Sequence, residues 1–270
     1  MIHELQRNEF YKCYELIDKE TLLEAAAVIN GINSGRIFVD SLDCPATAIV
    51  WLGNNDGFLF IGKAENPTLV KELNEWIDQF LKKEVSQLGL TWFEAIATHE
   101  SWYTFFENAF THRKTESWHQ EVYKIDQKKT HFSLKKGYHL LPLDHSLFNL
   151  PNVFQNVAEI EKKINECWDT TEAFCNQGIG YGIVYKNEIV SICYSGFVYK
   201  GAHNISIETK ASHRGQGLAE SCARAYVNEC VSRNVLPYWD CMIENKPSIA
   251  LARKLGCQKV QQYTGYTFPF

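Results

Sequence analysis

The spacing of apolar residues changes its period between residues 204 and 231. Over residues 204–209 apolar and polar side chains alternate, as in a strand with one face toward a core. From Leu218 onward the period becomes helical. The helix has apolar stripes at Leu218, Cys222, Tyr226 and Cys230 and at Ala219, Ala223, Val227 and Val231, and a polar stripe at Glu220, Arg224, Asn228 and Ser232. This pattern predicts a strand, a polar turn and a helix that packs against a core.

The rest of the second half predicts a mixed sheet with helices. The expected strands are residues 138–143, 180–185, 188–197, 236–243, 258–260 and 263–268, of which the second and third form a hairpin. A helical region is expected at residues 148–168. A short helix begins at Lys246-Pro247 and ends at Leu255, where Gly256 follows its last residue.

The first half predicts similar elements in a similar order. A short helix is expected at residues 21–30, and a turn at residues 53–57 joins two strands, 46–52 and 58–62. A longer helix begins at Asn66-Pro67 and stops at Gly89. A strand (90–97), a helix (99–110) and another strand (118–126) follow.

A basic, polar stretch at residues 127–137 indicates a domain boundary. We therefore expect a smaller N-terminal α/β domain at residues 1–130 and a second α/β domain at residues 131–270. Both halves contain a hairpin, helix, strand, helix and strand in that order. By fold analogy, the first domain is expected to be a degenerate copy of the second.

Composition excludes several classes of protein. The 270 residues are 45% hydrophobic and 22% charged, with a net charge of −5 and no long basic run, which disfavours nucleic acid as a partner. No apolar run reaches the roughly 18 residues of a membrane span, and the N-terminus has no signal pattern. The nine cysteines are dispersed without C-x-x-C, and the histidines lack ligand spacing. We expect a cytoplasmic protein with reduced thiols and no metal.

The turn between the strand and the helix predicts an anion site. It reads Arg214-Gly215-Gln216-Gly217-Leu218-Ala219. Small residues let the backbone approach a ligand, and the first N–H groups of a helix lack internal partners. The turn does not match a P-loop, and it lacks the context of a dinucleotide-binding fold. Alone, it is also compatible with a turn whose glycines only permit tight packing.

The order of motifs resembles the GNAT N-acetyltransferase superfamily. The turn R-x-x-G-x-A places Arg214, Gly217 and Ala219 at family positions, and N-x-x-S follows at Asn245 and Ser248 before a short helix and L-G. The resemblance covers about residues 138–270. It implies a mixed, mostly antiparallel sheet flanked by helices, and acetyl-CoA as co-substrate.

The resemblance also implies which residues bind coenzyme A. In the family, backbone N–H groups of this turn hold the pyrophosphate, and the N-x-x-S side chains lie near the pantetheine arm. The implied binding residues are Thr209, Arg214, Gly215, Gln216, Gly217, Leu218, Ala219, Asn245 and Ser248. A narrower likeness, at residues 207–209 and 237–241, is to the branch with zwittermicin-resistance-type acetyltransferases, in which the GNAT domain is C-terminal.

The implied reaction is direct attack of a primary amine on the acetyl thioester, with a carboxylate, or a water it holds, to collect the proton. Glu208 is the favoured base because Asn204, Ser206 and Glu208 place polar groups on a strand expected to be central. The alternative is that this face is only solvated. Asp240 is the second choice, and its alternative role is a structural hydrogen bond.

One position departs from the family. Many members have a tyrosine on the last helix as the acid for the thiolate, and this chain has Ala252 there. Tyr238, Tyr263, Tyr266 or water are the replacements to consider.

The leading hypothesis is therefore an acetyl-CoA-dependent N-acetyltransferase for a small-molecule amine, acting as a monomer or homodimer. A non-catalytic acyl-CoA-binding regulatory module is the alternative, and a nucleotide-binding protein is the third reading. The sequence leaves the acceptor amine open.

Overall fold

The computed structural model describes residues 1–53, 57–125, 129–150 and 154–270. Its contacts divide the chain into two units, which are Met1–Gln120 with Gln262–Phe270, and Glu121–Gln261. Strands β6 (Glu116–Ile125) and β12 (Cys257–Pro269) have residues in both units. Residues 54–56 of the predicted turn, Asp126 at the end of the predicted strand 118–126, residues 127–128 of the basic stretch and residues 151–153 of the predicted helical region lie outside the described residues.

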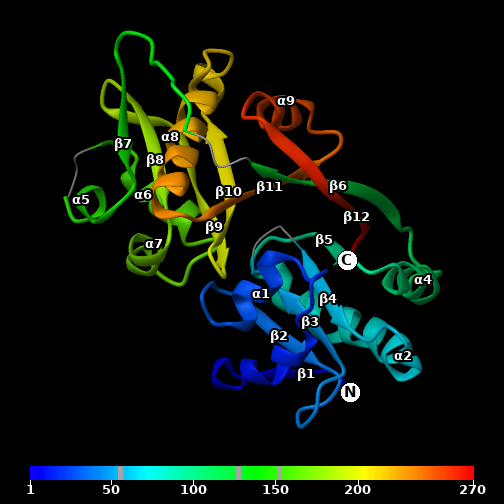
Figure 1. Ribbon diagram of the computed structural model, residues 1–270. Helices are drawn as coiled ribbons and strands as arrows, with labels where there is room; N and C mark the ends of the chain where they lie inside the picture. The colour runs from blue at the N-terminus through cyan, green and yellow to red at the C-terminus, as the bar shows by residue number, and fades with distance from the viewer. Residues whose placement is uncertain (54–56, 126–128, 151–153) are drawn as a thin grey trace. The chain divides into compact units, whose positions relative to one another are not determined.

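Unit 1 contains a mixed sheet with helices (Figure 1). Its further elements are β1 (His3–Leu5), η1 (Arg7–Leu16), α1 (Leu23–Ile29), β2 (Arg36–Val39), β3 (Thr47–Trp51), β4 (Phe58–Gly62), α2 (Pro67–Trp76), η2 (Ile77–Leu81), α3 (Lys82–Ser86), β5 (Trp92–Ala97) and α4 (Glu100–Ala109). Strands β1 to β4 pair antiparallel in sequence order, and β5 is parallel to β4. The helix predicted at 66–89 is the consecutive run α2, η2 and α3.

The chain's last residues complete unit 1. Thr264 to Pro269 of β12 pair antiparallel with Ala97 to Trp92 of β5. Phe268 is fully buried and stacks on Phe93, with 5.0 Å between ring centroids, and Phe93 stacks on Phe58 at 4.8 Å. Burial of an aromatic side chain stabilises a fold by about 1.5–3 kcal/mol. The chain end is therefore part of this core.

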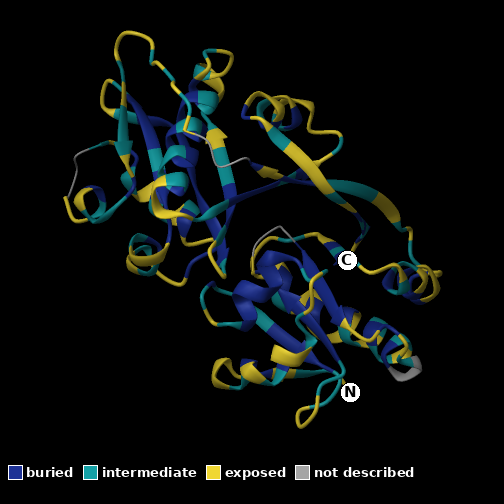
Figure 2. Cartoon of the chain, viewed as in Figure 1, coloured by how far each residue is buried: buried dark blue, intermediate teal, exposed yellow. Residues whose placement is uncertain are grey.

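Unit 2 is a mixed, mostly antiparallel sheet covered by helices. Its further elements are β7 (Tyr138–Pro142), α5 (His145–Phe148), α6 (Val157–Ile164), α7 (Thr171–Gln177), β8 (Gly180–Tyr185), β9 (Glu188–Tyr199), β10 (Ala202–Thr209), η3 (Ala211–His213), α8 (Leu218–Arg233), β11 (Leu236–Met242) and α9 (Lys246–Lys254). Strands β7 to β10 pair antiparallel, and β11 is parallel to β10. Strand β9 is buried along almost its whole length (Figure 2). The predicted fold class is therefore confirmed.

Helix α8 packs on the sheet through the predicted apolar stripe. Leu218, Cys222, Tyr226 and Cys230 are all buried, and the helix contacts β8, β9 and β10. On its polar stripe, the Asn228 side chain accepts from Thr130 N at 2.8 Å and donates to Thr130 O at 2.9 Å. These bonds fasten the segment before β7 to α8.

The structure differs from the sequence-based expectations in several places, and β1, η1 and β2 were not predicted. The helical region expected at 148–168 is not one helix: the described residues form α5, α6 and α7. Buried Asn156 exchanges hydrogen bonds of 2.9 Å with the backbone of Ile189, which fixes the chain just before α6. The strands expected at 258–260 and 263–268 form one strand, β12. The boundary expected after residue 130 differs from the observed units because Gln262–Phe270 packs with unit 1.

Candidate active site

Two parallel strands separate to form a cavity in unit 2. Strands β10 and β11 pair at only three positions, the last of which is Asn204 opposite Tyr238. Beyond it lies a cavity of about 650 Å³. Its lining residues are Ile207, Glu208, Thr209, His213, Arg214, Gly215, Gly217, Leu218, Ala219, Asn245, Pro247, Ser248 and Leu251. Of the predicted binding residues, only Gln216 is missing from this lining.

The turn into α8 leaves backbone N–H groups available. Gly215 and Gly217 have φ of +73° and +79°, a conformation that residues with a Cβ rarely adopt. Gly217 is the N-cap of α8, and no side chain caps this end. Apart from each glycine and its chain neighbours, no heavy atom of the described residues lies within 4 Å of the Cβ position of either glycine. The first N–H groups of α8 therefore have room to bind an anion.

Arg214 lies against the end of the preceding strand. Its Nε donates to the carbonyl oxygen of Thr209 at 3.0 Å. The hydroxyl of Thr209 lies 2.8 Å from the hydroxyl of Ser191 on β9. These bonds connect the turn to two strands and keep a positive charge beside the helix terminus.

Tyr138 holds the turn from the other side, a contact that the sequence analysis missed. Its hydroxyl lies 2.9 Å from His213 Nδ1 and donates to Gln216 Oε1 at 3.0 Å. Tyr185, opposite Tyr138 in the β7–β8 pair, also packs on the His213 ring, with 5.3 Å between centroids. Gln216, although absent from the cavity lining, is thus bonded to Tyr138, which also contacts His213 on the other side of the turn. No local pattern could reveal this, because 75 residues separate Tyr138 from His213.

We expect Tyr138→Phe to weaken the affinity for acetyl-CoA, the ligand that the sequence resemblance implies, about three- to tenfold, because one hydroxyl orders both sides of the turn and a lost hydrogen bond costs about 1 kcal/mol. Isothermal titration calorimetry measures this affinity. Tyr199→Phe, at the end of β9 and outside the cavity lining, is the matched control and should bind normally. Equal affinities of Tyr138→Phe and the unmodified protein would show that the Tyr138 hydroxyl does not order the turn.

Asn245 and Ser248 begin helix α9. The Asn245 side chain caps this helix by accepting from Ser248 N at 3.2 Å. The hydroxyl of Ser248 accepts from Trp239 Nε1 at 3.0 Å, and Trp239 is buried. Both residues line the cavity as expected, and both also have structural roles that the motif alone did not indicate.

Glu208 lines the cavity and forms an ion pair. Its side chain is 48% exposed, and Oε2 lies 2.5 Å from Nζ of Lys163 on α6. The adjacent polar residues Asn204 and Ser206 face β9 at Gly196, where a Cβ would lie 2.7 Å from Ser206 Oγ. The polar face of β10 is thus partly packed and partly open to the cavity.

Asp240 stands beside the point where the strands separate. Its Oδ1 accepts from Asn204 Nδ2 at 3.2 Å, and the residue is half-buried. Asp240 is absent from the cavity lining. The geometry therefore suits the structural alternative better than the role of a base.

The tyrosines that could replace the family's acid at position 252 lie in different parts of the structure. Ala252 is fully buried in the core of unit 2. Tyr238 is buried on β11, whereas Tyr263 and Tyr266 belong to unit 1. None of the three lines the cavity in unit 2.

Three thiols of unit 2 are unsuited to nucleophilic catalysis. Burial raises the pKa of Cys241, which follows Asp240, and also raises the pKa of Cys230 and Cys257 to about 12. A thiol with such a pKa stays protonated at neutral pH.

Within the part of the chain that the structure describes, no three His, Cys, Asp or Glu side chains group as a metal site. Among these same residues, no helix has the length and apolarity of a membrane span.

A family model described as GNAT acetyltransferase matches residues 14–266. The chain belongs to this family of acetyltransferases.

Individual relatives are similar over different lengths. The Bacillus subtilis (strain 168) protein called uncharacterized N-acetyltransferase YdfB is 36% identical over 139 residues, which are 52% of this chain and 51% of that protein. The match therefore spans about half the length of this curated relative.

Solved structures match the fold of the whole chain. A GCN5-related N-acetyltransferase-like protein from Streptococcus suis 89/1591 has a TM-score of 0.67 and 21% identity, over 97% of this chain and 98% of that one. A tandem GNAT protein from the clavulanic acid biosynthesis pathway has a TM-score of 0.61 and 11% identity, over 100% of this chain and 98% of that one. These likenesses extend the GNAT-like fold to both units.

Proposed function

We propose that the protein is an N-acetyltransferase that moves acetyl from acetyl-CoA to a primary amine of a small molecule. The observation that supports this best is the uncapped N-terminus of α8, where two glycines in the left-handed region line the β10–β11 cavity. A pyrophosphate needs such a set of backbone donors.

The remaining lining suits the rest of coenzyme A. Ile207, Leu218 and Leu251 give the cavity apolar contacts for a pantetheine arm. Beyond Asn204, strand β10 has no β11 partner, so its edge can pair with the amides of an extended ligand. The proposed binding residues are those predicted from the sequence, with Gln216 acting through Tyr138. When bound, acetyl-CoA supplies the activated acetyl thioester.

Direct transfer fits the side chains of the cavity. Glu208 is the proposed base, since its carboxylate is exposed in the cavity and already accepts from the ammonium of Lys163. A substrate ammonium can replace Lys163 at this carboxylate, lose a proton to it and become a nucleophile. Asp240 is proposed to act through Asn204 by fixing the separation of the strands. The protonated thiols disfavour a covalent acetyl-cysteine route.

Other assignments belong to the same proposal. We place the protein in the cytoplasm as a monomer or homodimer, without nucleic acid or membrane as partner, and in the zwittermicin-resistance-type branch. The N-terminal unit is proposed to be a degenerate GNAT-like unit.

A second candidate function is a non-catalytic acyl-CoA-binding regulatory module. Ala252 at the position of the family's tyrosine and the Lys163–Glu208 ion pair both favour it.

One experiment separates these functions. Acetyl-CoA is added to the full chain with a panel of polyamines, amino acids and arylalkylamines, and release of free thiol is followed. We expect amine-dependent release and thermal stabilisation by coenzyme A. Stabilisation without release under any amine would favour the regulatory module. Stabilisation by ATP or NAD but not by coenzyme A would contradict both functions.

A further inference from the structure

Buried Ser195 on β9 joins five segments of unit 2. Its hydroxyl oxygen lies 2.9 Å from Nδ1 of His203 on β10 and 2.9 Å from the hydroxyl of Tyr226 on α8, and it accepts from Ile179 N at 3.0 Å. Its carbonyl oxygen accepts from Trp168 Nε1 at 2.8 Å. All five residues are buried. These bonds connect β9 to β10, to α8, to the residue before β8 and to the segment between α6 and α7.

This cluster of hydrogen bonds is complete when the His203 ring is neutral. A serine hydroxyl donates one hydrogen bond and accepts two. Ser195 accepts from Ile179 N, and it can accept from Tyr226 and donate to Nδ1 of a neutral ring. A protonated ring is a donor at both nitrogens. Its Nδ1 would take the acceptor site used by Tyr226, and its second N–H would need an acceptor besides Ser195, the ring's hydrogen-bond partner among the described residues.

The groups that face His203 are uncharged on three neighbouring elements. On β11 the opposite residue is Pro237, and on β9 the ring meets the serine hydroxyl. On α8, burial raises the pKa of the Tyr226 phenol well above its usual range and raises the pKa of the Cys230 thiol to about 12, so both are protonated at neutral pH. None of these groups can balance a positive charge on the ring.

The charge that acts on His203 comes from Arg233, the last residue of α8. Its Nε donates at 2.7 Å to Glu229, four residues earlier on the helix. Burial, and after it the positive charge of Arg233, lower the pKa of His203 from its ordinary 6.5 to about 4. Among the described residues, no carboxylate acts on this pKa in the opposite direction. The ring is therefore neutral at neutral pH, as the cluster requires.

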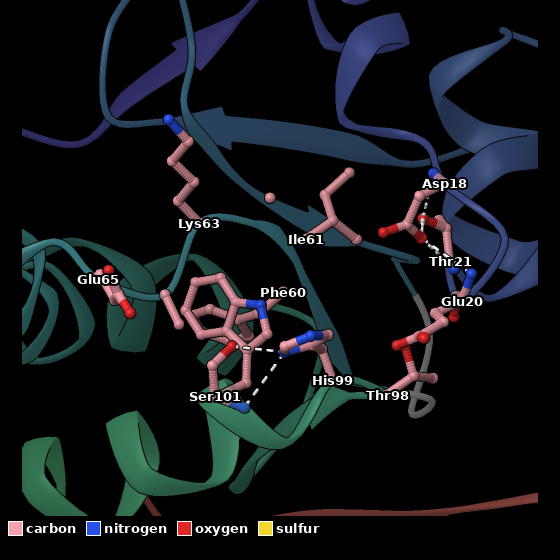
Figure 3. Close-up of a pocket in the computed structure, with 13 residues that line it drawn as sticks. Asp18, Glu20, Thr21, Phe60, Ile61, Lys63, Glu65, Thr98, His99 and Ser101 are labelled. Carbon is pink, nitrogen blue, oxygen red and sulfur yellow. Dashed lines mark hydrogen bonds between the residues drawn. The ribbon is translucent and has the colours of Figure 1, made fainter.

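Contact with a serine does not by itself disfavour a charged ring. In unit 1, His99 Nδ1 lies 2.7 Å from Ser101 Oγ and accepts from Ser101 N at 3.3 Å (Figure 3). That residue is exposed, so water can solvate its ring in either charge state. His203 is 4% exposed and has no such access. Burial is thus the feature that distinguishes His203.

We propose that His203 makes unit 2 sensitive to acid. Protonation of this ring breaks the cluster at Ser195 and loosens the contacts among β9, β10 and α8. His203 is opposite Pro237, one position before Asn204 and Tyr238, which form the last pair of β10 and β11. The cavity between these strands begins next to the cluster, so acid also opens its closed end. This property involves no ligand and is independent of the proposed function.

The direction of the effect follows from proton binding in the two states. The unfolded chain binds a proton at the ordinary histidine pKa of 6.5, whereas the folded chain binds it only near pH 4. His203 therefore stabilises the folded state above pH 6.5, and this stabilisation is lost as the pH falls from 6.5 towards 4. We expect His203 alone to make the unfolding equilibrium constant about 30-fold larger at pH 5 than at pH 7.5.

Hydrogen–deuterium exchange with mass spectrometry tests this in the full chain at these two pH values, after correction for the intrinsic exchange rates. Opening of peptides from β9 and α8 should increase about 30-fold at pH 5 in the unmodified protein. In His203→Asn it should change less than about threefold, because asparagine keeps an acceptor for Ser195 but binds no proton. His139→Gln, an exposed residue of β7, is the matched control and should behave like the unmodified protein.

Two results of the exchange experiment would overturn the proposal. One is an equal increase in the unmodified protein and in His203→Asn, and the other is unchanged opening of β9 and α8 at pH 5 in the unmodified protein. If His203→Asn does not fold, NMR of the nine histidine rings of the unmodified protein replaces it. A ring that stays neutral at pH 5 is then expected, and protonation of all nine rings at that pH would overturn the proposal.

Discussion

Gly217→Glu is expected to lower the affinity for acetyl-CoA at least about 100-fold, because juxtaposed like charges cost several kcal/mol. The substitution places a carboxylate where the phosphates are proposed to bind, at the first N–H groups of α8. Gly217 has φ of +79°, and an added Cβ there has open space around it. The fold should tolerate it, with a backbone cost of about 1–2 kcal/mol. Isothermal titration calorimetry with acetyl-CoA measures the loss.

Gly201→Glu is the matched control for this variant. Gly201 lies between β9 and β10, has φ of +74° and also has no heavy atom within 4 Å of its Cβ position. The same charge and a similar backbone strain are thus introduced outside the cavity. Gly201→Glu should bind acetyl-CoA normally. Unchanged affinity in a folded Gly217→Glu protein would remove the basis of the proposed function.

The second large effect is expected for Glu208→Gln, which should lower kcat about 100- to 1000-fold while leaving the affinity for acetyl-CoA unchanged. The amide keeps the size of the side chain but cannot accept the proton of the substrate ammonium. Steady-state thiol release with the best amine of the panel gives kcat, and calorimetry gives the affinity.

Breaking the Lys163–Glu208 ion pair is an alternative cause of such a loss, and Lys163→Gln distinguishes the two. This variant breaks the same 2.5 Å contact but keeps the carboxylate. We expect its kcat to equal or exceed that of the unmodified protein, since Lys163 no longer competes with the substrate. Full activity of Glu208→Gln, or an equal loss in both variants, would remove Glu208 as the base.

The helix that follows the first strand of each parallel pair begins differently in the two units. In unit 2 the helix after the first parallel strand begins at an uncapped glycine, and in unit 1 it begins with Asn66 as cap and a proline. The first terminus has backbone N–H groups available for an anion, whereas at the second the Asn66 side chain already accepts from Leu69 N.

The sequence by itself predicted the elements around the proposed active site. The strand at 204–209, the turn and α8 are all encoded within about 30 consecutive residues, by the alternation of side chains and by glycines at the turn. The Asn245 cap and the end of α9 at Gly256 are equally local. The region 148–168 was predicted less well, because a tertiary contact between Asn156 and Ile189 fixes where α6 begins.

Only the tertiary structure decided which distant residues meet. It paired the end of β12 with β5, Tyr138 with the turn, and Lys163 with Glu208. Periodicity records which face of an element is buried, but it does not record which partner covers that face. Contacts between residues 45 or more positions apart arise from packing and hydrogen bonding of the whole unit, so a single sequence has no local signal for them.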